Sequence, residues 1–135
     1  MALSAQDALI YVMIVTAAAD RALSENELSR VGGLVDRLPV FEGYDRENLG
    51  PVADQCVSAM KQADDLEAVL DVVIEALPER LHDTAYAVAV EIAAVDLDVK
   101  QEELRWLEML RDRLVIDRLD TAAIERAARA RFRRA

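Results

Sequence analysis

The sequence has 135 residues and a formal net charge of -10, because 26 acidic residues outnumber 16 lysines and arginines. A chain of this length fits one domain that buries roughly two-thirds of its unfolded surface. Its acidity repels nucleic-acid phosphates and favours cations or basic partners, which argues against nucleic-acid binding. The single cysteine, Cys56, cannot form a disulfide within the chain, and we interpret it as a small buried side chain that fits a reducing cytoplasm.

The charge is unevenly distributed along the chain. Five arginines and one glutamate give residues 124–135 a charge of about +4, so the residues before them carry about -14. We interpret this end as a solvated last helix, because cations suit a helix C-terminus, in preference to a nucleic-acid arm. Residues 1–6 lack a secretory signal, and the apolar run 8–19 is shorter than the ~20 residues of a membrane-spanning helix. We therefore expect a cytoplasmic protein without a transmembrane segment.

Few glycines and prolines interrupt the chain and strand signals are nearly absent, so the expected fold class is all-α. Periodicity and capping residues predict a bundle of about seven helices: residues 5–19, 24–38, a third starting within 45–51 and ending near 62, 64–77, 78–95, 101–114, and a last helix capped by Asp120 or Thr121. Close packing against another helix would explain Gly32 and Gly33 in the second helix. His82 is expected on the surface, whereas Trp106 and Tyr86 are expected in the core or a groove.

The chain matches itself when it is shifted by 76 positions. Asp20 then meets Asp96, Glu27 meets Glu103, and further matches include Asp7 with Asp83, Leu34 with Leu110, Asp36 with Asp112 and Arg37 with Arg113. Each copy consists of an apolar helix, an acidic turn and an amphipathic helix. We therefore expect a single domain over 1–135, with repeat one at 7–38, connector helices at 45–77, repeat two at 83–114 and a basic helix at 120–135. The two apolar helices are expected at its centre, related by a pseudo-two-fold axis.

The repeated unit resembles the TerB (tellurite-resistance protein B) family. The stretch Ala17-Ala18-Ala19-Asp20-x-x-Leu23-Ser24-x-x-Glu27 is similar to the family's alanine-rich helix end, acidic turn and helix start, and residues 93–103 resemble its second copy. Arg21 and Leu97 stand where a glycine often follows the aspartate. The resemblance covers residues 7–114 and implies a non-catalytic protein of a metal or tellurite stress response.

Two interpretations of the acidic turns remain open. The pattern Ser24-x-x-Glu27 is a capping box, in which both side chains bond to amides at a helix start. Alternatively, clustered carboxylates select hard cations, and Ca²⁺ or Mg²⁺ would then be bound by Asp20 with Glu27, and by Asp96 and Asp98 with Glu102 or Glu103. Lys100 cannot cap the second turn, which makes that turn the better candidate. An EF-hand is excluded, because Leu107 or Val31 would replace its bidentate glutamate.

The remaining residues offer no catalytic constellation. One histidine and one cysteine cannot form a zinc site, and phosphate loops, nucleophile elbows and Cys/His dyads are missing, so no enzyme is expected. Glu91, the one ionisable residue in an apolar helix, either joins an acidic cluster with Asp96 or is exposed. Two functions follow: a TerB-like protein that binds divalent cations, or an interaction module whose acidic surface docks a basic or membrane-associated protein.

Overall fold

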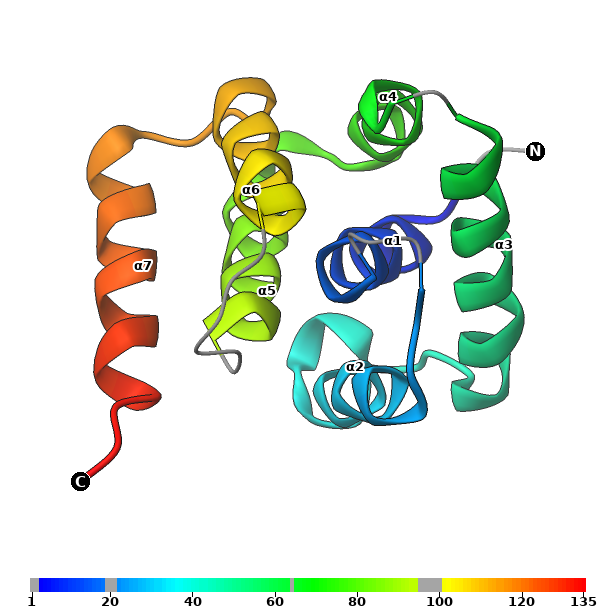
Figure 1. Ribbon diagram of the computed structural model, residues 1–135, viewed down its shortest axis with the longest axis horizontal. Helices are drawn as coiled ribbons and strands as arrows, with labels where there is room; N and C mark the ends of the chain where they lie inside the picture. The colour runs from blue at the N-terminus through cyan, green and yellow to red at the C-terminus, as the bar shows by residue number, and fades with distance from the viewer. Residues whose placement is uncertain (1–2, 19–21, 64, 95–100) are drawn as a thin grey trace.

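An almost wholly apolar helix lies at the centre of the structure, a computed structural model that describes residues 3–18, 22–63, 65–94 and 101–135. This helix, α1 (Ala5–Ala17), begins where the Ser4 side chain accepts a hydrogen bond from the backbone amide of Asp7. Every residue from Ala8 to Ala17 is buried. A helix that is apolar on all sides needs neighbours on all sides, and α1 contacts helices of both halves of the chain (Figure 1).

The predicted all-α fold is confirmed, and the described residues contain no strand. After α1 the elements are α2 (Glu25–Arg37), η1 (Pro39–Phe41), η2 (Arg46–Asn48), α3 (Leu49–Gln62), α4 (Glu67–Ala76), η3 (Glu79–Leu81), α5 (His82–Ala94), α6 (Gln101–Arg113) and α7 (Arg118–Arg131), where η marks a short 3-10 helix. The predicted caps of α7 are wrong. Asp117 caps this helix, since its side chain accepts from the amide of Leu119 at 3.2 Å.

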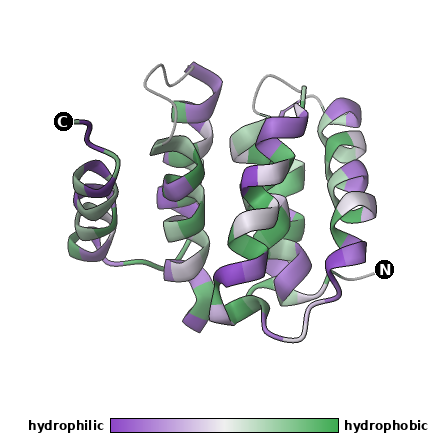
Figure 2. Ribbon diagram, turned by 90° about the horizontal axis from the view of Figure 1, so that it is seen from below, coloured by the Kyte–Doolittle hydropathy of each residue, from purple (hydrophilic) through white to green (hydrophobic). Residues whose placement is uncertain are grey.

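The helices form two groups around the central pair α1 and α5. Helices α2, α3 and α4 surround α1, whereas α6 and α7 pack on α5, and α7 lies at the outer edge (Figure 1). Hydrophobic residues gather on the inner sides of the helices and hydrophilic residues on the outer sides (Figure 2). No helix in the described ranges combines the length and the apolar character needed to cross a membrane.

Trp106 links the two groups through a buried hydrogen bond. Its side chain is fully buried, as expected, and its indole Nε1 donates to the hydroxyl of Thr16 on α1 at 3.1 Å. The Thr16 hydroxyl in turn donates to the carbonyl of Val12 at 2.7 Å. The prediction for Cys56 is also confirmed, because its thiol is fully buried against α1 and burial raises its pKa to about 12.

His82 is buried, so its predicted surface position is wrong. The ring is 3 % exposed, and its Nδ1 accepts a hydrogen bond from the backbone amide of Val115 at 2.9 Å. Its Nε2 lies 3.2 Å from the carbonyl of Leu77, so the neutral ring with its proton on Nε2 satisfies both partners. The connection between α6 and α7 passes over the start of α5 and buries His82, which α5 alone would leave exposed to solvent.

The glycine pair in α2 makes room for a side chain and not for the predicted neighbouring helix. A Cβ atom on Gly32 would clash with Nη2 of Arg46, which approaches from η2. The Arg46 guanidinium bonds to Asp36 at 3.1 Å. Gly33 is less restricted, because a Cβ atom there would meet only the Arg37 guanidinium, at 3.4 Å.

Candidate functional site: a groove between α2, α5 and the end of α7

Three of the six predicted metal ligands, Asp20, Asp96 and Asp98, lie outside the described residues. Glu27 forms the predicted capping box. Its carboxylate accepts from the amide of Ser24 at 2.9 Å, and the Ser24 hydroxyl accepts from the amide of Glu27 at 3.1 Å. One carboxylate oxygen of Glu27 is therefore committed to the start of α2.

The other two predicted ligands, Glu102 and Glu103, occupy the first turn of α6. Glu102 is exposed, whereas Glu103 is only 6 % exposed. Acidic residues are favourable in a first turn because the helix dipole is positive there. In the described part of the chain, which lacks the three aspartates, no group of three or more His, Cys, Asp or Glu residues is arranged to hold a metal ion.

Glu91 takes a partner that neither of its two predicted roles included. Its carboxylate forms an ion pair with the guanidinium of Arg131, at the end of α7. This hydrogen bond raises the pKa of Arg131. The Glu91 side chain is 22 % exposed and that of Arg131 55 %, and Glu91 forms part of the wall of a surface groove.

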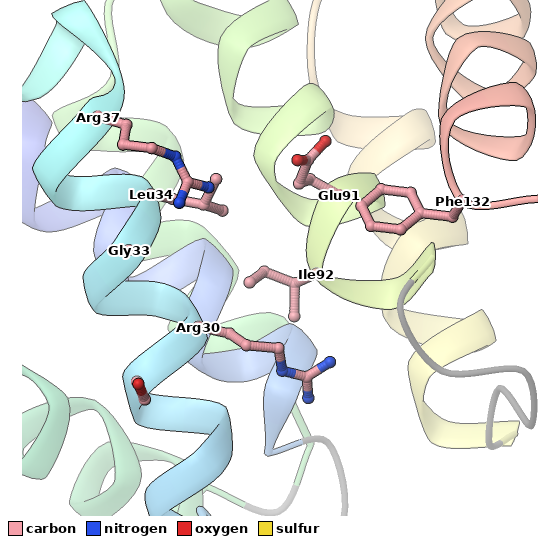
Figure 3. Close-up of a pocket in the computed structure, with 8 residues that line it drawn as sticks. Arg30, Gly33, Leu34, Arg37, Glu91, Ile92 and Phe132 are labelled. Atoms are coloured by element: carbon pink, nitrogen blue, oxygen red, sulfur yellow. The ribbon is translucent and has the colours of Figure 1, made fainter.

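The groove is a cavity of about 390 Å³ between α2, α5 and the end of α7 (Figure 3). Its walls come from Ser29, Arg30, Gly33, Leu34, Arg37, Glu91, Ile92 and Phe132. Leu34 and Ile92 are almost fully buried and form its apolar floor. The guanidinium of Arg131 lies 5.2 Å from the centroid of the Phe132 ring, which holds this aromatic wall beside the ion pair.

The spacing of residues along α2 explains how one helix supplies five of the eight residues that line the groove. Arg30, Leu34 and Arg37 are four and then three residues apart, so they share one face of the helix. Two turns separate the arginines, which places their Cα atoms about 10 Å apart along the axis. Gly33 leaves the wall between them without a side chain.

Arg30 and Arg37 make no ion pair or side-chain hydrogen bond with any residue in the described part of the chain. Four other arginines do have carboxylate partners there: Arg46 with Asp36, Arg111 with Glu125, Arg113 with Glu67 and Asp71, and Arg131 with Glu91. The groove is therefore lined by two guanidinium groups, those of Arg30 and Arg37, and by one carboxylate, that of Glu91, which Arg131 pairs. The groove is a positively charged site on a protein of net charge -10.

A second polar cluster anchors α7 on α5 and α6. Tyr86 donates to the carboxylate of Glu125 at 2.5 Å and accepts from Arg111 at 2.9 Å. Burial, followed by the bond to Glu125, raises the pKa of Tyr86 to about 12. These three residues pair with one another, which makes the cluster a structural clamp.

Comparisons of this chain with protein-family models, with curated proteins and with solved structures found no match. The groove was not predicted from the sequence. Its only sequence signal is the helical spacing of Arg30, Leu34 and Arg37. Glu91, Ile92 and Phe132 come from segments far away along the chain, which no local pattern connects to α2.

Proposed function

We propose that this chain is a non-catalytic, TerB-like binding protein whose ligand site is the groove between α2, α5 and the end of α7, and that its ligand is an anion. The observation that carries the proposal is the pair of guanidinium groups, Arg30 and Arg37, that face one groove without an acidic partner in the described residues. Guanidinium groups bind carboxylates and phosphates through paired N–H donors. The volume of about 390 Å³ lies in the range of small-molecule sites.

The lining residues favour binding over turnover. Ser29 supplies the one hydroxyl among them, none of the eight is a cysteine, and none is a histidine or lysine that would activate the serine as a nucleophile. The positive charges instead attract and orient an anion, and the apolar floor provides contact for its carbon atoms.

Amide chemical shifts test this function. Acetate, phosphate and sulfate are titrated separately at low ionic strength, and the amides of residues 29–37 and 91–92 are expected to move. The double variant Arg30→Gln/Arg37→Gln is expected to lose these shifts. A control, Arg80→Gln/Arg126→Gln, removes the same charge from positions outside the groove. Equal losses in both variants would mean that net charge alone attracts the anion.

A divalent cation at the second acidic turn is a second candidate, in the metal or tellurite stress response that the TerB resemblance implies. Its support is the buried Glu103 beside the exposed Glu102, which follow Asp98 by five and four residues in the sequence. Titration with Ca²⁺, Mg²⁺ or Mn²⁺ should move the amides of residues 96–103, and Glu102→Gln should weaken this response. A lack of shifts at millimolar metal would refute the candidate.

A further inference from the structure

We infer that the ligand of the groove is an elongated organic dianion, with two carboxylates joined by an apolar chain, that bridges Arg30 and Arg37. The inference rests on the proposed function, because it names the ligand class of the same groove. It follows from where the two charges lie and from what lies between them.

The two guanidinium groups lie at opposite ends of the groove. Figure 3 shows Arg37 beside Leu34 at one end and Arg30 beyond Ile92 at the other, both directed across the groove. Their Cα atoms are two helical turns, or about 10 Å, apart along α2. In this arrangement a compact anion such as sulfate contacts one arginine at a time. A longer molecule with an anionic group at each end contacts both.

Between the two arginines the α2 wall is formed by Gly33, which has no side chain of its own. The only side-chain atoms within 4 Å of a Cβ atom at Gly33 belong to the Arg37 guanidinium, the nearest at 3.4 Å. Leu34 and Ile92 form the floor, and the Phe132 ring forms part of the opposite side. Each methylene group buried there strengthens binding roughly fourfold. An alkyl chain between the two carboxylates therefore fits this surface.

The one carboxylate in the groove does not oppose such a ligand. Glu91 is neutralised by its ion pair with Arg131, so the two unpaired arginines set the charge that a ligand meets. Arg37 also lies in the last turn of α2, where a cation is favourable without any ligand. Arg30 lies in the middle of the helix and has no such explanation, which makes it the more informative residue to change.

The internal repeat provides a comparison within the same molecule. Arg113 occupies the position in repeat two that Arg37 occupies in repeat one. Arg113 bonds to two carboxylates, those of Glu67 at 2.9 Å and Asp71 at 2.7 Å, both on α4. In the described residues Arg37 has no such acids, and its guanidinium faces the groove instead.

Calorimetric titration with linear dicarboxylates of increasing length tests the inference. Succinate, adipate, suberate and sebacate are compared with octanoate, which has the chain length of suberate but only one carboxylate. Affinity is expected to pass through a maximum at suberate or sebacate, at least tenfold above both succinate and octanoate. A flat length dependence, or octanoate binding as tightly as suberate, would overturn the inference.

Three variants locate the binding. Arg30→Gln is expected to reduce the affinity for suberate about tenfold, to the level of octanoate, and Gly33→Leu is expected to abolish binding by filling the middle of the groove without changing its charge. The control Arg80→Gln/Arg126→Gln should leave the affinity unchanged, and circular dichroism checks that each variant is folded. Retained suberate affinity in Arg30→Gln contradicts the bridging geometry.

The outcomes separate this inference from the proposed function. If acetate and sulfate shift the amide signals of the groove but the dicarboxylates show no optimum length, the proposal of an anion site is retained and the inference of a dianion is wrong. If no anion moves these amides, both proposals fail.

Discussion

The hydrogen bond from Trp106 to Thr16 joins α6 to α1, and a double-mutant cycle measures its contribution to stability. Both side chains are fully buried, and the indole nitrogen lies 3.1 Å from the hydroxyl oxygen. Thr16→Val replaces the hydroxyl with a methyl group of similar shape. Trp106→Phe removes the N–H donor and part of the ring.

The expected loss of stability for each substitution follows from the group that it leaves unpaired or the cavity that it creates. Thr16→Val leaves a buried indole N–H without its acceptor, which costs about 1–3 kcal/mol, and the added methyl recovers at most about 0.8 kcal/mol. We expect a net loss of about 1–2 kcal/mol. Trp106→Phe leaves a cavity and is expected to cost about 2–4 kcal/mol. The double variant has no orphaned donor, so it should be more stable than the sum of the single changes predicts, by about 1 kcal/mol.

Urea unfolding followed by far-UV circular dichroism gives the four free energies, since a domain of this size is expected to unfold in two states. Thr16→Val with Tyr44→Phe is a control cycle. Tyr44 bonds to Asp7, nine residues before Thr16 and about 13 Å away along α1, so these changes should be additive. Additivity within about 0.5 kcal/mol in the Trp106 cycle would refute the proposed coupling.

Three further changes test other parts of the structure, each by denaturant unfolding. Gly33→Ala should stabilise the protein by about 1 kcal/mol, because alanine is the better helix former and its Cβ meets only a flexible guanidinium; a loss of stability would contradict this. His82→Leu should cost about 2–4 kcal/mol, because the amide of Val115 and the carbonyl of Leu77 lose their partner; a neutral result would contradict the bridge. Burial raises the pKa of the Cys56 thiol from 9.0 to about 12, so its contribution is complete below the ordinary pKa and is lost as pH rises towards the folded value. By about pH 10 the free energy of unfolding of the wild type should therefore fall by about 1.4 kcal/mol more than that of Cys56→Ala. Parallel curves of unfolding free energy against pH would refute the burial of the thiol.

The central pair of helices could be predicted from the sequence because their signal is local. A helix with apolar residues on all sides belongs inside a bundle, and both α1 and α5 lie there. The capping box of α2 depends on two residues three positions apart, Ser24 and Glu27, and it was likewise predictable.

The wrong or missing predictions concern residues whose partners are distant in the sequence, and a helix start where several neighbouring residues could form the cap. His82 is buried by a connection 33 residues later in the chain, which its own helix pattern does not reveal. Asp117, Asp120 and Thr121 all have the side-chain oxygen that a cap needs, and only the path of the chain after α6 selects the first. The groove likewise depends on Glu91 and Phe132 reaching α2 from separate helices.

The internal repeat predicts the same role for matched residues, but the structure gives them different partners. Asp7 accepts a hydrogen bond from Tyr44 in the connector after repeat one, whereas the matching Asp83 bonds to the amide of its own neighbour, Thr84. The matched arginines also differ in their partners, since α4 supplies two acids to Arg113 and none to Arg37.

These differences arise because each repeat is covered by different helices. The matched residues that form the core must keep their packing in both copies. The polar residues at the edges contact whichever residues the connecting segments place beside them. A charged residue that has a carboxylate partner in one copy and none in the other is therefore not explained by the repeat alone. Arg37 is such a residue, and it lies in the groove with Arg30. This asymmetry supports the proposal that the groove, and not a feature that both copies share, binds a ligand.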